Sequence, residues 1–364
     1  MPLIWAAISA HGYGHAAQVV PVLNALGALV PDLHALLRTT VQTSFFQDRL
    51  MLPWEMSAVQ QDVGCIQDGP LTINSDTTWR THEQFHATWH DRLSKEVDAL
   101  RAARPDIVLA DAPYLALAAA KAAGIPSVAH VSLTWDLVLA SLPSPPMIDR
   151  RAFLEAIRSA YRQADHALRI TPCPKIDVFA NPTDISPIAE PSAAARRELA
   201  AVLNLRPQEK TVLIGFGGIP FTSLPFDELN RMEGYRFLID GPVPENNTLC
   251  VSTRDLPFTF KTLLASVDVI MTKPGYGTIV EAVALKQPVV YVRRYTFADE
   301  EALVEFLHRY GRGIELSREN FTHARWETAL TQVLQQLPPH TPLPPVTGAM
   351  EAAAFLASHL GSRA

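Results

Sequence analysis

Residues 266–301 read SVDVIMTKPGYGTIVEAVALKQPVVYVRRYTFADEE. An apolar run (267–271) leads into a loop with Gly275 and Gly277, a periodic apolar segment (279–285) follows, and a second apolar run (289–292) ends the unit. This order predicts a strand, a tight glycine loop, a helix and a second strand. Such a βαβ unit is typical of a parallel sheet covered by helices.

The glycine loop predicts a site for an anion. Gly275 and Gly277 allow close approach of the backbone, and the first N–H groups of the next helix lack partners within the helix. A diphosphate is favoured there by these donors, by the helix dipole and by Lys273. Glu281 falls one helical turn after Gly277, where its carboxylate can accept hydrogen bonds from ribose hydroxyls. The alternative is an ordinary tight turn with a solvated glutamate.

Composition limits the class of protein. The chain has 364 residues, long enough for two domains, and its apolar fraction of 48% predicts substantial cores. The net charge is −6 without a basic cluster, so we do not expect a nucleic-acid partner. Three scattered cysteines show no metal-ligand spacing, and no segment is long and apolar enough to span a membrane. A cytoplasmic protein without a metal cofactor is expected.

The pattern of strand, glycine loop and helix also occurs near the N-terminus. A buried strand is predicted at 3–9, followed by a loop with His11, Gly14 and His15 and a helix at 16–29. Further strands are predicted at 34–38, 106–110 and 127–131, and a long helix at 85–103. The proline-rich segment 171–191 predicts an interdomain linker. A second series then includes strands at 211–216, 236–239 and 248–252.

We therefore expect an α/β protein with two Rossmann-like domains, at 1–185 and 186–345, and a last helix within 346–364 that packs back on the first domain. In such sheets, ligands bind outside the carboxyl ends of the strands. Two domains that face each other would form a cleft there, with the nucleotide on the second domain and another substrate on the first.

These features resemble the GT-B glycosyltransferases, which have two Rossmann-like domains with parallel sheets facing across a cleft. In the bacterial enzyme that makes lipid II and in UDP-dependent plant transferases, a glycine loop opens a helix whose glutamate holds the donor ribose, and Gly275, Gly277, Thr278 and Glu281 match that order. The chain has a closer resemblance to the glycosyltransferase-like N-terminal region of plant L-arabinokinase and its stand-alone bacterial relatives. The matching phrases are AHGYGHAAQVV (10–20), PDIVLADAPYLALAAAKAAGIPSVAH (105–130), TWDLVLA (134–140), GFGGIP (215–220) and KPGYGTIVEAVALKQPVVYVRRYTFADEEAL (273–303).

Transfer from a nucleotide sugar requires a base for the acceptor hydroxyl. A neutral imidazole titrates near working pH, and a carboxylate raises its basicity and fixes its tautomer. We expect His15 to be this base and Asp111 to orient it, and the resemblance to the plant enzymes implies the same pair. His15 could instead bond to nearby backbone, and Asp111 could cap the helix that starts at Tyr114.

The remaining candidates concern the leaving group, the donor sugar and the acceptor. Carboxylates accept hydrogen bonds from sugar hydroxyls well, although an acidic first turn of a helix would look the same. We expect the diphosphate and ribose to contact Gly217, Gly218, Lys273, Gly275, Tyr276, Gly277, Thr278 and Glu281. We expect the donor sugar to contact Asp299, Glu300 and Glu301. Candidate acceptor or phosphate contacts are His11, Gly14, Trp135, Asp136 and Arg293, of which Trp135 could be a core residue and Arg293 a solvated or paired arginine.

The sequence thus predicts a metal-independent, inverting glycosyltransferase that uses an NDP-sugar, with a UDP-sugar favoured, and a hydroxyl acceptor. The resemblance implies direct displacement. Two alternatives remain open: a catalytically silent nucleotide-sugar-binding or regulatory module, and an NDP-sugar epimerase.

Overall fold

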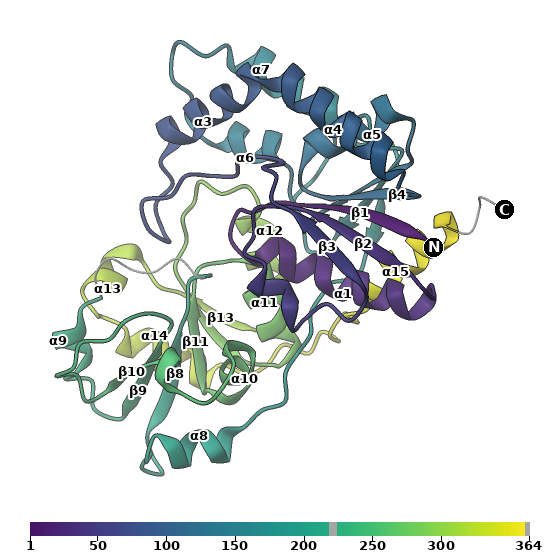
Figure 1. Ribbon diagram of the computed structural model, residues 1–364. Helices are drawn as coiled ribbons and strands as arrows, with labels where there is room; N and C mark the ends of the chain where they lie inside the picture. The colour runs from purple at the N-terminus through teal and green to yellow at the C-terminus, as the bar shows by residue number, and fades with distance from the viewer. Residues whose placement is uncertain (218–223, 361–364) are drawn as a thin grey trace.

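The computed structural model describes residues 1–217 and 224–360 and shows two parallel sheets (Figure 1). The first sheet has the strand order β3-β2-β1-β4-β5-β6-β7. Its strands are β1 (Leu3–Ile8), β2 (His34–Arg38), β3 (Trp54–Ser57), β4 (Ile107–Asp111), β5 (Ser127–Val131), β6 (His166–Ile170) and β7 (Thr183–Ile185). Every pairing in this sheet is parallel, as the alternation of strands and helices predicts.

The second sheet, as far as the described residues show it, has the order β10-β9-β8-β11-β12-β13 and is also parallel. Its strands are β8 (Lys210–Ile214), β9 (Tyr235–Ile239), β10 (Cys250–Ser252), β11 (Val269–Thr272), β12 (Pro288–Tyr291) and β13 (Arg312–Glu315). The glycine-loop unit of residues 266–301 forms β11, the helix α11 and β12 at the centre of this sheet. The predicted βαβ unit is therefore present.

Helices cover both faces of the sheets. Those of the first half are α1 (Gly14–Leu29), α2 (Ser44–Gln47), α3 (Ser75–Ala87), α4 (Trp89–Ala103), α5 (Tyr114–Ala123), α6 (Trp135–Ser141) and α7 (Arg150–Tyr161). Those of the second half are α8 (Arg196–Val202), α9 (Phe226–Leu229), α10 (Phe260–Ser266), α11 (Tyr276–Ala284), α12 (Glu300–Tyr310), α13 (Arg318–Thr322), α14 (Glu327–Gln335) and α15 (Gly348–Leu360), with a 3-10 turn at Thr253–Asp255.

Alternation along β1 explains the layers. Ile4 and Ile8 face the core that contains α1, whereas Trp5 and Ala7 face the core built with α4 and α5. A strand buried on both faces needs such a continuous apolar run. The first of these cores also includes residues of α11, so it continues from one domain into the other.

The predicted helix at 85–103 is wrong in extent. The chain forms α3 and α4 instead, separated at Thr88, which has non-helical backbone angles (φ −109°, ψ 19°). The Thr88 hydroxyl donates a hydrogen bond to the carbonyl of Phe85, and Arg92 donates to that hydroxyl. A threonine that bonds locally in this way competes with the helical hydrogen bonds.

The predicted linker at 171–191 contains one further strand of the first sheet, β7, so only its end connects the domains. Here the Tyr276 hydroxyl donates to the Thr171 carbonyl and accepts from the Ile188 amide, at 2.8 and 3.0 Å. At the end of the chain, α15 packs against α1 (Figure 1). Its first residue must be small, because a Cβ on Gly348 would lie 1.9 Å from the Ser186 carbonyl oxygen.

Among residues 1–217 and 224–360, no helix has the length and apolar character needed to cross a bilayer.

Candidate functional site

A cavity of about 500 Å³ lies where the two domains meet. Loops at the carboxyl ends of both sheets line it, as predicted for this fold. Its described lining residues are Ala10, His11, Gly12, Tyr13, Gly14, His15, Gln18, Val63, Cys65, Gln67, Ser132, Leu133, Gly217, Lys273, Gly275, Tyr276, Gly277, Thr278, Arg294, Phe297 and Asp299. A surface hollow of similar volume beside α7 is lined, among the described residues, by that helix alone, so it joins no two elements into a site.

His15 and Asp111 form a buried pair on the first-domain side. His15 lies in the first turn of α1, and Asp111 is the last residue of β4, next to β1 in the sheet. His15 Nδ1 lies 2.7 Å from Asp111 Oδ1. Asp111 does not cap α5, whose N-cap has no side-chain hydrogen bond. The alternative reading of Asp111 as a helix cap is therefore wrong.

The electrostatics of this pair favour a basic imidazole. Burial lowers the pKa of His15, but the hydrogen bond to Asp111 and its negative charge outweigh burial and leave the pKa above its ordinary value. Burial raises the pKa of Asp111, yet the hydrogen bonds from His130 and His15 hold it below the usual range. With Nδ1–H donated to Asp111, the other ring nitrogen of His15 is the one that can accept a proton.

His11 also lines the cavity but is neutral. Burial and nearby positive charges lower its pKa to about 3. Its Nδ1 accepts a hydrogen bond from the Cys65 amide at 3.1 Å, and its ring stacks near Phe297 with centroids 6.2 Å apart. A cationic contact between His11 and a diphosphate, which the sequence left open, does not fit this environment.

The glycine loop of the second domain brings backbone and the side chain of Lys273 to the cavity. Gly275 is the N-cap of α11, and Gly277 and Thr278 lie in its first turn, beside the cavity. The Lys273 amine donates to the Phe216 carbonyl at 2.7 Å and lies close to Gly217. Burial, then the charge of Arg294, lowers the pKa of Lys273 to about 7. Gly218 lies outside the described residues.

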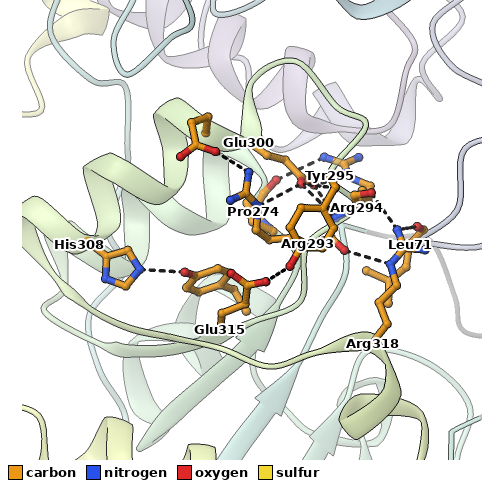
Figure 2. Close-up of polar contacts among 11 residues, drawn as sticks. Leu71, Pro274, Arg293, Arg294, Tyr295, Glu300, His308, Glu315 and Arg318 are labelled. Carbon is orange, nitrogen blue, oxygen red and sulfur yellow. Dashed lines mark hydrogen bonds and ion pairs between the residues drawn. The ribbon is translucent and has the colours of Figure 1, made fainter. Parts of the chain in front are cut away.

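The three acidic residues at the start of α12 have different environments. Asp299 lines the cavity, its Oδ1 is buried without a partner among the described residues, and burial raises its pKa to about 6. The Glu300 carboxylate is fully buried and accepts from the side chain and amide of Arg294 and from the Tyr295 amide (Figure 2). Glu301 is exposed and pairs with Arg293 at 2.7 Å. Glu300 and Glu301 thus have protein partners and are absent from the described cavity lining, and their contact with the sugar stays a prediction.

Arg293, Arg294 and Tyr295 belong to a loop that is tied to both domains. Arg318 of α13 donates to the carbonyls of Arg293 and Arg294, and also to that of Leu71 in the first domain (Figure 2). The Tyr295 hydroxyl donates to Glu315. Arg293 is thus a paired arginine in this loop and does not line the cavity.

Other predicted contacts are directed away from the cavity. Glu281 pairs with Lys261 of α10 at 3.1 Å, and it is absent from the described cavity lining. The Tyr276 ring borders the cavity, but its hydroxyl bonds to Thr171 and Ile188 in the linker segment 171–191. Trp135 is a core residue whose indole N–H donates to Asp62 at 2.7 Å, and Asp136 pairs with Arg158. The ribose role of Glu281 and the acceptor roles of Trp135 and Asp136 are not supported by these positions.

Phe297, His130 and Asp62 lie at or near the site, although no sequence pattern singled them out, and the sequence suggests Arg294 only as a partner of phosphate or of the nearby acids. Arg294 and Phe297 line the cavity, and the Arg294 guanidinium lies 4.0 Å from the Phe297 ring centroid. His130 bonds to Asp111, and Asp62, a buried carboxylate with a pKa raised to about 6 by burial, lies near His15. The described residues hold no group of three or more His, Cys, Asp or Glu side chains placed to bind a metal ion.

No protein-family model matches the chain. The chain is similar to L-arabinokinase from Arabidopsis thaliana, with 26% identity over 342 residues. The similar region covers 91% of this chain but 32% of that enzyme, so the chain spans about a third of the length of this curated relative.

Solved glycosyltransferases resemble the chain in structure. The calicheamicin glycosyltransferase CalG4 gives a TM-score of 0.62 at 15% identity and covers 100% of this chain and 99% of its own. The glycosyltransferase of kitacinnamycin gives a TM-score of 0.61 at 17% identity, and the match covers 99% of this chain and 95% of that one. Phytolacca americana UGT2, in complex with UDP-2fluoro-glucose and pterostilbene, gives a TM-score of 0.61 at 15% identity. The match covers 99% of this chain and 94% of that one. The predicted GT-B glycosyltransferase fold is confirmed.

Proposed function

We propose that this protein is a glycosyltransferase that moves a sugar from an NDP-sugar to a hydroxyl acceptor. The observation that carries the proposal is one cavity with a buried His15–Asp111 pair on one side and the start of α11 with Lys273 on the other. A base and an anion site that share a cavity are the two elements that such a transfer needs.

In the proposed reaction, His15 removes the proton of the acceptor hydroxyl through the ring nitrogen that Asp111 leaves free. The acceptor oxygen bonds to the anomeric carbon while the bond from that carbon to the diphosphate oxygen breaks. A single displacement of this kind inverts the anomeric configuration. Asp111 stays ionised and stabilises the imidazolium that forms.

The leaving diphosphate would be stabilised by the amides of Gly277 and Thr278, by the dipole of α11 and by Lys273. Gly217 lies beside the Lys273 amine, because a Cβ at this position would be 3.4 Å from it. The absence of a side chain there would leave room for the diphosphate to approach the Gly217 backbone. Asp299 is the acidic side chain of α12 that faces the cavity, so we assign it the hydroxyls of the donor sugar. No metal ion is required in this scheme.

We favour a UDP-sugar because of the resemblance to UDP-dependent enzymes and because UGT2 was solved with UDP-2fluoro-glucose. The direct test is incubation with a panel of nucleotide sugars, with and without hydroxyl acceptors, in the presence of EDTA. Release of nucleoside diphosphate with an inverted glycoside, shown by NMR, would support the proposal. Binding without turnover would indicate a silent binding module, and a changed sugar without an acceptor would indicate an epimerase.

A further inference from the structure

Asp111 is bonded by a second histidine that lies deeper in the fold. In the first sheet, Asp111 of β4 and His130 of β5 are directly paired in register. His130 Nδ1 lies 3.1 Å from Asp111 Oδ2, while His15 Nδ1 lies 2.7 Å from Oδ1. His130 and Asp111 are both fully buried. Each oxygen of the carboxylate therefore has its own imidazole.

The geometry also fixes the tautomer of His130. Its Nε2 is buried and has no hydrogen-bond partner among the described residues. An unpaired N–H in the core is costly, so the arrangement favours a proton on Nδ1, where it is donated to Asp111, and a lone pair on Nε2. Within the described part of the chain, Nε2 has no partner to which a proton could pass, so the contribution of the ring is its hydrogen bond to the carboxylate.

We propose that His130 is a positioning residue for the base: by holding Oδ2 of Asp111, it keeps Oδ1 aligned with His15 and shares the charge of the carboxylate. The proposal rests on the proposed function, in which His15 is the base. His130 itself touches neither substrate nor reacting atoms. A ring that only filled space would leave the titration of His15 unchanged.

Removal of this hydrogen bond should raise the proton affinity of the His15–Asp111 pair. The carboxylate would lose one of its two donors, so a proton bound anywhere in the pair would be held more tightly. A hydrogen bond to a charged group contributes about 1.5 kcal/mol or more, so its loss should move the midpoint of the titration by about one pH unit. Asp62, Asp299 and His11 also act electrostatically on the pair, and Tyr276 interacts with Asp111.

These neighbours do not obscure the comparison. His11 is neutral down to a pH of about 3, whereas Asp62 and Asp299 each have a pKa near 6, so their ionisation changes the charge around His15 as the pH passes that value. All three are common to wild type and the variants. A displacement of the His15 titration curve between wild type and a His130 variant therefore reports on His130.

The test is an NMR titration of the His15 side chain in the ligand-free protein, compared among wild type, His130→Phe and His130→Asn. Asparagine places an N–H near the position of Nδ1, whereas phenylalanine has no donor. We expect a midpoint about one pH unit higher in His130→Phe and a smaller displacement in His130→Asn. Equal midpoints in all three proteins would overturn the proposal.

If His130→Phe does not fold, His130→Gln takes its place, because its amide extends toward the Nε2 position and leaves Oδ2 without a donor. Where transfer is observed, the acidic limb of kcat/KM should move by the same amount, with KM for the nucleotide sugar unchanged. A displaced titration in a protein without any transferase activity would support the role of His130 and refute the proposed function.

Discussion

The loops at 10–15 and 273–278 follow central strands of the two sheets, precede helices and line the same cavity, yet they contribute different chemistry. The first carries an imidazole whose partner, Asp111, is rigidly held at the end of a neighbouring strand. The second carries glycines, a helix N-terminus and a lysine whose pKa burial lowers to about 7. One local pattern can therefore serve proton transfer or anion binding, according to the side chains placed on it and the sheet residues behind it.

The sharpest test of this division is the loss of the base. We expect His15→Gln and Asp111→Asn to lower kcat by about 10²–10⁴-fold, the range found for general acid–base catalysis. Nucleotide affinity, measured by calorimetry, should remain within about twofold of wild type, because the anion site is on the other domain. A large loss of nucleotide affinity with both variants would show that the two loops do not divide the work in this way.

A negative charge placed in the second loop should lower nucleotide affinity and leave the His15–Asp111 pair intact. A Cβ at Gly277 would meet no atom within 4 Å, and an acidic residue in the first turn of α11 suits the helix dipole, so Gly277→Asp should fold. We expect nucleotide affinity to fall about tenfold or more relative to Gly277→Asn, which has the same shape without the charge. Equal affinity of these two variants, measured by calorimetry, would place the diphosphate elsewhere.

The lysine predicts a pH dependence of binding. Lys273, with a pKa of about 7, is protonated in the free protein below that pH and neutral above it, whereas a bound diphosphate favours the protonated form. Nucleotide-sugar affinity should therefore fall as pH rises above 7, by at most about tenfold per unit. The diphosphate of a nucleotide sugar is substituted at both ends and does not titrate in this range.

Lys273→Met provides the matched control for that dependence. Its affinity should be lower than that of wild type at pH 6 and nearly constant from pH 6 to 9. A slope that persists in Lys273→Met would assign the titrating group to another residue, with Asp299 next in line because it also faces the cavity.

The contrast between the loops also shows what the sequence could and could not predict. The fold follows from apolar runs broken by glycine, and Asp111 was recognisable because a charged residue at a strand end faces the ligand side. His130 gave no such signal, because it lies inside an apolar strand and its pairing with Asp111 exists only once β4 and β5 are in register.

The positions of Glu281 and Glu300 differ from the expectation for another reason. Helical spacing placed Glu281 toward the mouth of the cavity, but Lys261 on a neighbouring helix pairs with it. Glu300 lies in the acidic first turn that the sequence offered as an alternative, and its carboxylate binds Arg294 from the preceding loop. Both pairings depend on tertiary contacts that a local pattern does not contain.

The smallest expected effect concerns Tyr276, which follows the glycine N-cap of α11 but directs its hydroxyl to the linker segment 171–191. Tyr276→Phe removes the hydrogen bonds with Thr171 and Ile188 while keeping the ring. Because a buried amide and a partly buried carbonyl lose their partner, the free energy of unfolding should fall by about 1–2 kcal/mol, measured by urea denaturation. Nucleotide affinity should change less than twofold. A tenfold loss of affinity would mean that the hydroxyl leaves Thr171 and Ile188 to bind the ligand, and Tyr276 would then join Lys273 as a ligand-binding side chain of the second loop.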